Sequence, residues 1–340
     1  MSMSGVTSNK LIDDNGRVRT GVLQMPIDEV NYLDYDLRTV MDRPRSALAR
    51  RWRFNQFQFV SAMGPDWLFG LAIVDLKLVS NAFFYLYDFR TGEMLERSLL
   101  QPLAWRTDIA PRPETGKAVF VQGSTRITIE PGGSGRRVTV EDGNRINIDL
   151  QMTGDEDPLR MASQAGYNGW VFTRKSAGLP VTGSVRWEGR EFQCGDNWRG
   201  AIDWSCGYMR RETAWNWASL AGCTADGHSV GLNLAAGVNE TGVTENALWL
   251  DGRCIKLEMA QFEFDRYDPS APWRVTTTDG RVDLRFVPSG VRKERMDVLL
   301  MASNFRQYAG TFEGEVRDEL GNVVTVSGLR GLMEDHYARW

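Results

Sequence analysis

The 340-residue chain is long enough for about two domains, and its 42% hydrophobic and 25% charged residues are typical of a globular protein. Its formal net charge of −4 excludes a global attraction to nucleic acid or to an anionic membrane. No stretch approaches the roughly 18 consecutive apolar residues of a membrane span, and the polar N-terminus lacks the apolar core of a signal peptide. These features predict a cytoplasmic protein without a membrane span.

Residues 1–20 are largely polar, and we predict that they form a loose arm. The run 43–53 holds five arginines, and we interpret it as a solvated or ion-paired segment rather than a nucleic-acid patch. Sustained helical periodicity is scarce, and only 36–51 is compatible with short helical turns. Runs of alternating apolar residues dominate instead, such as 125–130 and 146–152, and Gly-containing turns separate them. Short strands at regular spacing predict an antiparallel barrel or sandwich.

The second half of the chain repeats the pattern of the first. Asn216 and Gly231 follow Asn55 and Gly70 by 161 positions each (from 55 to 216 and from 70 to 231), and an aromatic residue precedes each Asn. This spacing is close to half the chain and is too long for a solenoid repeat. It suits a barrel of eight or more strands, which either fills with side chains or holds one small ligand.

We therefore predict an all-β protein of two tandem antiparallel β-barrels that arose by internal duplication. Residues 1–20 would be the arm, 21–190 the N-terminal barrel and 191–340 the C-terminal barrel.

The segment 194–221 is the richest in functional side chains. It contains four of the twelve Trp residues, Trp198, Trp204, Trp215 and Trp217, interspersed with charged residues. A pocket wall of flat apolar faces with a few aimed polar groups has this composition. A domain junction held by aromatic side chains and ion pairs has it too, and one segment can serve both purposes.

Motifs for metal binding and nucleophilic catalysis are scarce. The sequence has two histidines, His228 and His336, and its four cysteines form no C-x-x-C pair, so neither a zinc site nor a redox motif is indicated. It contains no nucleophile elbow, phosphate-binding loop or dinucleotide fingerprint. We predict no metal and no cofactor, and we expect carboxylates to move the protons in any reaction.

The candidate catalytic residues are Asp203, Glu212 and Glu245. Asp203 has apolar neighbours in the sequence, and burial would keep it protonated and ready to act as a general acid. The alternatives are an ion pair with Arg199 or Arg210 for Asp203, and a surface or junction salt bridge for Glu212.

Side chains alternate between the two faces of a strand, and this predicts which candidate residues point in the same direction. Asp203 and Ser205 would share one face of a strand opposite Trp204, and Trp215 and Trp217 would likewise share a face. The residues that we predict to bind a ligand are Asn55, Asp196, Trp198, Trp204, Arg210, Trp215, Asn216, Trp217, Asn246 and His336. For Asn55 and Asn216 the alternative is a strand-end hydrogen bond. Glu334, Asp335 and His336 could approach the segment 194–221 from the C-terminus, and the alternative for them is a plain charged tail.

Two segments resemble a known signature. D-W-S-C-G (203–207) and W-N-W (215–217) are similar to the D-H-x-x-G … W-x-W signature of the lipocalin-like hydroxyneurosporene synthase and AttH group. With the terminal G-L-M-E-D-H-Y-A-R-W (331–340), they also resemble the bacterial family known as domain of unknown function 2804, and this likeness extends over nearly the whole chain.

The resemblance implies two lipocalin-like, calycin-type barrels with the signature near their interface. The wider group includes hydratases, cyclases and pericyclic catalysts that act on isoprenoid or polyketide ligands. Trp204 stands where the signature has His, so an acid–base role of that His does not transfer to this chain. Asp203, Trp215 and Trp217 match the signature and remain candidates.

We predict a cofactor-independent acid–base enzyme of the hydratase, isomerase or cyclase type. Its substrate would be a largely apolar, isoprenoid-like small molecule in a pocket at the barrel interface. The alternatives are a non-catalytic carrier of a hydrophobic ligand and a carbohydrate-active protein, because Trp platforms beside paired carboxylates also suit sugars. The sequence indicates no nucleic-acid partner.

Overall fold

The computed structural model describes residues 9–238, 242–298 and 301–339, and this part of the chain consists largely of antiparallel strands. Its helical elements are the 3-10 helix η1 (Tyr32–Asp34) and the helix α1 (Ala47–Arg53). Ser46 caps α1 by accepting a hydrogen bond from the amide of Ala49. None of the described helices is long and apolar enough to cross a membrane.

The first sheet joins fourteen strands of the described chain, and eleven of them pair in the order β5-β4-β3-β2-β14-β12-β10-β9-β8-β7-β6. Of the others, β11 and β13 pair with β12, and β1 pairs with β11. The strands are β1 (Gly21–Val22), β2 (Asn55–Met63), β3 (Trp67–Asp75), β4 (Val79–Asp88), β5 (Met94–Pro102), β6 (Thr107–Ile109), β7 (Ala118–Gln122), β8 (Thr125–Gly132), β9 (Gly135–Asp142), β10 (Ile146–Met152), β11 (Leu159–Ala165), β12 (Gly169–Trp187), β13 (Arg190–Cys194) and β14 (Arg199–Gly207).

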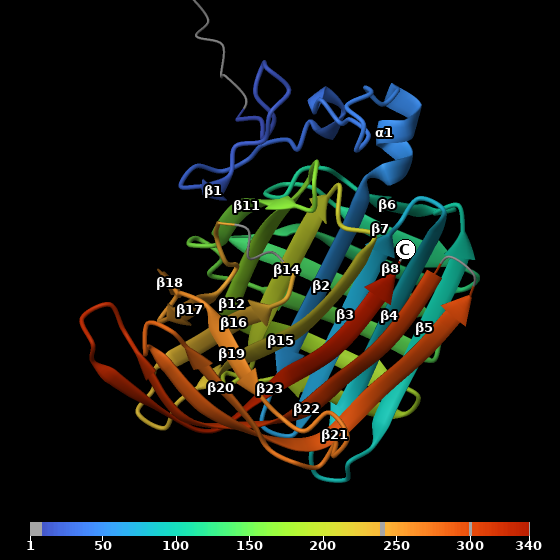
Figure 1. Ribbon diagram of the computed structural model, residues 1–340. Coiled ribbons are helices and arrows are strands. Elements are labelled where there is room, and N and C mark those ends of the chain that lie inside the picture. Colours follow the sequence, from blue (N-terminus) through green and yellow to red (C-terminus); the bar gives the residue numbers. More distant parts are fainter. Residues whose placement is uncertain (1–8, 239–241, 299–300, 340) are drawn as a thin grey trace, which may run out of the picture.

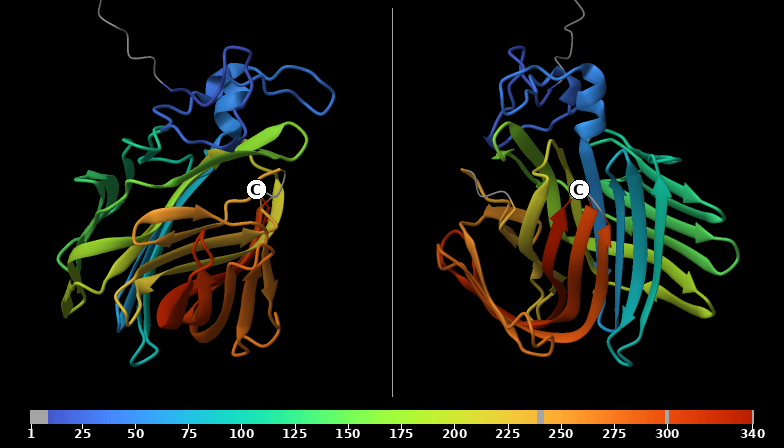
Figure 2. Two further views of the ribbon diagram at one scale, coloured as in Figure 1. Left: turned by 90° about the vertical axis from the view of Figure 1, so that its left-hand side faces the viewer. Right: turned by 45° about the vertical axis from the view of Figure 1, so that its right-hand side comes forward.

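The second sheet joins nine strands of the described chain in the order β18-β17-β16-β15-β23-β22-β21-β20-β19. These strands are β15 (Glu212–Cys223), β16 (Ser229–Ala236), β17 (Ala247–Leu250), β18 (Arg253–Lys256), β19 (Ala260–Glu263), β20 (Trp273–Thr277), β21 (Val282–Val298), β22 (Met301–Arg317) and β23 (Val323–Arg339). Figures 1 and 2 show that both sheets curl into half-barrels and that the second sheet lies against β2, β3 and β4 of the first.

The two sheets share one strand order. In each unit, four consecutive strands (β2 to β5, or β15 to β18) form a meander. The first strand of the meander, β2 or β15, pairs with the last strand of the unit, β14 or β23. Beyond this last strand, the remaining strands of the unit follow in reverse order along the chain. The repeated Asn residues fall in these matching strands, Asn55 in β2 and Asn216 in β15. The predicted all-β architecture of two lipocalin-like units is confirmed, and the common topology is the one that an internal duplication produces.

The strand pairing places the change of sheet later than the predicted boundary at residues 190 and 191. Both β13 and β14 pair within the first sheet, so the chain changes sheet between Gly207 and Glu212. The reason is that Ile202, Trp204 and Cys206 of β14 fill the core of the first unit. We propose a division into two domains at residues 208–211.

The described part of the expected loose arm is packed against the first sheet. Leu11 and Ile12 are buried and belong to its apolar core. Backbone hydrogen bonds from Leu23 to Arg160 and from Val30 to Pro111 attach this segment to the first unit. Residues 1–8 lie outside the described part of the chain.

Each half-barrel is filled by its own side chains. Trp170 and Trp187 lie in the first core, and Trp273 and Phe312 lie in the second. A further apolar cluster combines residues of both sheets, with Phe59, Tyr85 and Tyr87 from the first and Trp217, Ala309 and Leu332 from the second. This cluster buries the two sheets against each other and fixes the position of the polar side chains between them.

Glycines allow the closest approach of the two sheets. A Cβ atom on Gly231 of β16 would lie 2.2 Å from the carbonyl carbon of Ala177 in β12. Contacts this short do not occur between real atoms, so any side chain at position 231 would push the sheets apart.

Candidate functional site

The polar side chains between the sheets come from strands that are otherwise apolar. Lys175 of β12 and Asp203 of β14 are direct partners in the β12–β14 ladder, so their side chains emerge from the same face of the first sheet. This face lies against the second sheet, whereas Trp204 turns into the first half-barrel. The predicted separation of Asp203 from Trp204 is therefore confirmed.

Lys175 is the centre of a buried ionic cluster. Its ammonium Nζ donates to Asp203 Oδ2 at 2.7 Å, to Glu245 Oε1 at 2.9 Å and to Asn233 Oδ1 at 3.3 Å. Burial lowers the pKa of Lys175, but the charges of Asp203 and Glu245 more than offset this effect, so the pKa lies above its usual value. One ammonium against two carboxylates leaves a net negative charge between the sheets.

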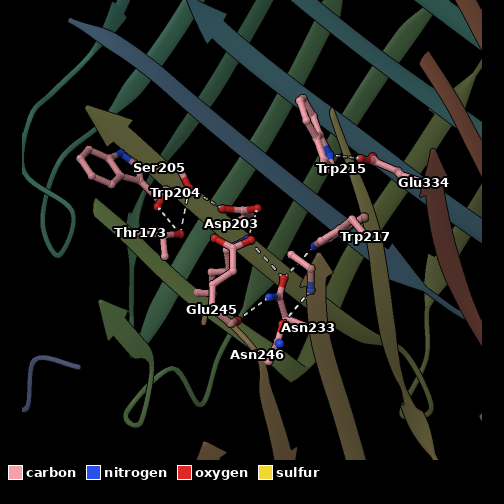
Figure 3. A network of polar contacts seen from close by, with 12 residues as sticks. Thr173, Asp203, Trp204, Ser205, Trp215, Trp217, Asn233, Glu245, Asn246 and Glu334 are labelled. Atoms are coloured by element: carbon pink, nitrogen blue, oxygen red, sulfur yellow. Dashed lines mark hydrogen bonds and ion pairs between the residues drawn. The ribbon is translucent and has the colours of Figure 1, made fainter. Parts of the chain in front are cut away.

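Further hydrogen bonds fix the geometry of this cluster (Figure 3). Ser205 Oγ donates to Asp203 Oδ1 at 3.0 Å and shares a 2.8 Å hydrogen bond with Thr173. On the opposite sheet, the indole of Trp217 donates to Asn233 Oδ1 at 2.8 Å. Because Asn233 also contacts Lys175, the cluster links both sheets through charged and polar atoms.

The space enclosed beside the cluster is small. It measures about 10 Å³ and is lined by Phe59, Lys175, Asp203, Trp217 and Asn233 with their neighbours. That is room for about one water molecule, which would find several polar partners there.

A second polar cluster centres on Glu334 of β23. Its carboxylate accepts hydrogen bonds from Gln307 Nε2 at 2.6 Å and from the indole of Trp215 at 3.3 Å, and Tyr85 of the first sheet donates to Gln307. Burial raises the pKa of Glu334 to about 7; the negative charge of Asp203 acts in the same direction, and the two hydrogen bonds oppose it. Glu334 therefore holds its proton more tightly than an ordinary glutamate.

His336 lies beside Glu334 and is uncharged. Its ring packs between Trp215 and Phe305, with ring centres 4.2 Å and 4.8 Å away, and its Nε2 shares a 3.0 Å hydrogen bond with Ser303 Oγ. Burial lowers the pKa of His336 to about 3. The imidazole therefore serves as an apolar wall with a polar edge and not as a cation.

The structure brings several of the predicted site residues together. Asp203, Glu245 and Trp217 belong to the Lys175 cluster, and Trp215 and His336 lie around Glu334. Trp215 and Trp217 share one face of β15, as predicted from strand alternation. Asn246 lies just behind the Lys175 cluster, where its side chain accepts from the amide of Ala235 and donates to the carbonyl of Glu258.

Other predicted residues lie elsewhere. Glu212 is exposed at the start of β15, where Tyr337 donates to it, and Asn216 donates to Asp335 on the face of β15 opposite Trp215. The remaining five are distributed around the first unit: Asn55 at the buried start of β2, Asp196 in an exposed turn, Trp198 packed against Gly64, Trp204 in the core and Arg210 beside Gly166.

The ion pair considered for Asp203 exists, but its partner is Lys175 rather than Arg199 or Arg210. Arg199 instead donates to the carbonyl of Asp196 and to Ser229. The sequence contained a signal for Lys175, which is a cation in the long apolar and small-residue run 171–181. A Lys in a buried strand needs a carboxylate partner, and Asp203 was the available one.

The fold is that of two lipocalin-like half-barrels with a buried polar site between them, and it is similar to the fold of an AttH-like protein. The family described as Domain of unknown function (DUF2804) matches residues 4–340, so the chain belongs to that family. No curated protein matches the sequence.

Solved structures share the fold at low sequence identity. The crystal structure of CghA with Sch210972 is 9% identical with a TM-score of 0.56, and the alignment covers 94% of this chain and 98% of that one. An AttH-like protein of Nitrosomonas europaea is 13% identical with a TM-score of 0.50, covering 84% of this chain and 92% of that one. A third match, kievitone hydratase of Nectria haematococca, is 9% identical with a TM-score of 0.43, covering 84% of this chain and 88% of that one.

Proposed function

We propose that this protein is a cofactor-independent acid–base enzyme that acts on an uncharged, largely apolar small molecule at the junction of the two sheets. The reaction would be an addition, elimination, isomerisation or cyclisation. The observation that carries the proposal is Glu334, a buried carboxyl group whose pKa is about 7 and which lies among aromatic side chains near Asp203. A group with this pKa gives and takes protons at neutral pH with the least penalty.

The two carboxylates have different surroundings, which is the usual arrangement of an acid and a base. Asp203 is paired with the Lys175 ammonium and oriented by Ser205, so it presents a fixed carboxylate to the site, and we assign it the role of the base. Glu334 is bound only by neutral donors, the Gln307 amide and the Trp215 indole, so its protonated form is accessible and it is suited to donate.

The charges favour a substrate that becomes more positive during the reaction. The Lys175 cluster carries a net negative charge, and the indole face of Trp215 attracts cations. Protonation of a double bond or a carbonyl oxygen by Glu334 would create positive charge in this environment. An anionic substrate would be repelled by Asp203 and Glu334, so we expect an uncharged one.

The enclosed space beside Asp203 holds about one water molecule. We therefore place the body of the substrate beside Phe57 and Trp215, which are only partly buried. A water molecule in the enclosed space would be positioned next to Asp203, as an addition of water requires.

The carbohydrate alternative is supported less. A groove of about 580 Å³ lies at the far end of the first sheet and contains Trp67, Phe192 and Trp198. Phe192 stacks between the two Trp rings, and the Arg90 guanidinium covers Trp67. Sugar rings need open aromatic faces, and these faces are already occupied.

The test is proton exchange between a bound ligand and the solvent. Small molecules released from the purified protein would be identified by mass spectrometry, returned to the protein in D₂O, and followed for deuterium incorporation at carbon. We expect exchange with the wild type and a loss of about 100-fold or more in Glu334→Gln, while ligand binding persists. Glu313→Gln, in the same sheet but exposed, is the matched control. Unchanged exchange in Glu334→Gln would contradict the proposal and leave the carrier alternative.

A further inference from the structure

The end of the first sheet where the chain enters β2 has apolar side chains on its surface. Leu78, in the turn between β3 and β4, is 67% exposed, and in the turn between β5 and β6 Leu103 is 63% and Trp105 is 70% exposed. The amide of Leu103 donates to the carbonyl of Leu78, so the two turns lie side by side. Three large apolar side chains therefore face solvent at neighbouring turn tips.

Helix α1 adjoins these turns and extends the apolar surface. The ammonium of Lys77 lies 5.8 Å from the ring centre of Phe54, the residue that follows α1. On α1 itself, Leu48 is 66% and Trp52 is 42% exposed, and none of its residues is buried. Figure 1 shows α1 standing on this end of the sheet.

Unpaired basic residues gather at the same end. Partial burial and the positive charges of Arg45 and Arg211 lower the pKa of Arg53, which shows that the three guanidinium groups lie near one another. Unlike Arg38 or Arg90, none of these three forms an ion pair with a carboxylate of the described residues. Arg106 is exposed directly after Trp105. These basic side chains lie close to the exposed apolar residues although the chain as a whole has a net charge of −4.

We propose that this end of the first sheet is a docking surface for an anionic lipid membrane. The docking surface comprises Leu48, Trp52, Leu78, Leu103 and Trp105 as inserting side chains and Arg45, Arg53, Arg106 and Arg211 as the groups that contact lipid phosphates. Trp and aliphatic side chains insert at the boundary between headgroups and acyl chains, and basic residues around them bind anionic headgroups.

The aliphatic residues favour lipid over nucleic acid as the partner. Single-stranded nucleic acid binds to aromatic platforms on which its bases stack. Leu48, Leu78 and Leu103 offer no such platform, whereas they are well suited to insertion among acyl chains. The surface is also made of turn tips and one short helix, so it can enter a headgroup layer without any change in the sheets.

The docking surface and the proposed active site are compatible. Arg211 immediately precedes β15, and Trp215 of the Glu334 cluster follows four residues later. An apolar substrate concentrated in a bilayer would therefore be close to the site. The docking proposal does not depend on this link, since it rests on the exposed apolar and unpaired basic residues alone.

The test is sedimentation of the full-length protein with sucrose-loaded vesicles of phosphatidylcholine, with and without phosphatidylserine, at ionic strength of about 0.1 M. We expect binding to the mixed vesicles to exceed binding to pure phosphatidylcholine by about tenfold or more. The triple variant Arg45→Gln/Arg53→Gln/Arg211→Gln should lose this difference. The double variant Leu103→Ser/Trp105→Ser should lower binding to the mixed vesicles by about tenfold.

Matched controls are Leu320→Ser, which changes a Leu that is 88% exposed in the turn between β22 and β23, and Arg285→Gln, an exposed Arg of β21. Both should bind like the wild type. Thermal unfolding of each variant shows whether it is folded. Any of three results would overturn the proposal. The first is equal binding to both kinds of vesicle, and the second is binding that the two multiple variants leave unchanged. The third is binding to a single-stranded oligonucleotide but not to vesicles.

Discussion

Replacing Lys175 with methionine tests the role of the ionic cluster between the sheets. The substitution keeps the volume of the side chain but removes the ammonium that Asp203 and Glu245 share at 2.7 Å and 2.9 Å. Two carboxylates would then face each other at a site where their side chains are only 13% and 7% exposed. Loss of one partner from a buried ion pair typically costs about 3–5 kcal/mol, so we expect the free energy of unfolding of Lys175→Met to fall by that amount at pH 7.

The pH dependence supplies a second, more specific signature. Without Lys175, both carboxylates hold their protons more tightly in the folded state than in the unfolded state. Such groups contribute stability at low pH that is lost as the pH rises through the folded pKa. The deficit of Lys175→Met relative to the wild type should therefore shrink as the pH falls from 7 towards 5.

The assay is chemical unfolding in urea, followed by Trp fluorescence, at several pH values. Lys293→Met, an exposed Lys in β21, is the control and should change stability by less than about 0.5 kcal/mol. A loss below about 1 kcal/mol in Lys175→Met, or a deficit that does not depend on pH, would refute the description of Lys175 as the charged centre of a buried cluster.

The same interface makes three further effects measurable. Burial raises the pKa of Glu334 to about 7, so the contribution of this group to stability is full below about pH 4.5 and is lost as the pH rises through 7. In unfolding titrations, Glu334→Gln should therefore be more stable than the wild type at pH 8 by up to ~3 kcal/mol, and the difference should vanish near pH 4. Trp217→Phe removes the indole donor to Asn233 and should cost about 1–2 kcal/mol in urea unfolding, and a change within error would show that this hydrogen bond contributes nothing. Gly231→Ala forces a Cβ atom against the backbone of Ala177 and should lower the free energy of unfolding by at least ~2 kcal/mol. The control Gly195→Ala has open space around its Cβ atom and should be neutral. Equal melting temperatures of the two variants would contradict the close packing of the sheets.

The architecture was largely predictable because it depends on local and repeating signals. Alternation of apolar residues specifies strands, and the 161-residue spacing between Asn55 and Asn216 specifies two copies of one unit. The position of the sheet change was not predictable from the same signals. β14 comes after the predicted boundary at residues 190 and 191, but its partners are β2 and β12, and only long-range pairing decides which sheet a strand joins.

The candidate site was predicted in part, for a related reason. Asp203, Trp215, Trp217 and Glu245 are marked by motifs and by their place in the repeat, and they do lie between the sheets. Glu334 was predicted only as part of a C-terminal segment that could reach this region, and not as a catalytic candidate. Its raised pKa comes from burial against Gln307 of the neighbouring strand β22 and near Tyr85 of the first sheet. The contact with the first sheet depends on residues far apart in the sequence, so no local pattern indicates it.

The central claim is that a proton is exchanged at Glu334 near neutral pH, and its most direct test is the titration of that carboxyl group. The protein would be labelled with ¹³C at the side-chain carboxyl of glutamate, and the NMR shifts would be followed from pH 4 to pH 9 in the wild type and in Glu334→Gln. The account predicts one resonance that titrates near pH 7 and is missing from the variant. Glutamate resonances that all titrate below pH 5 would contradict it.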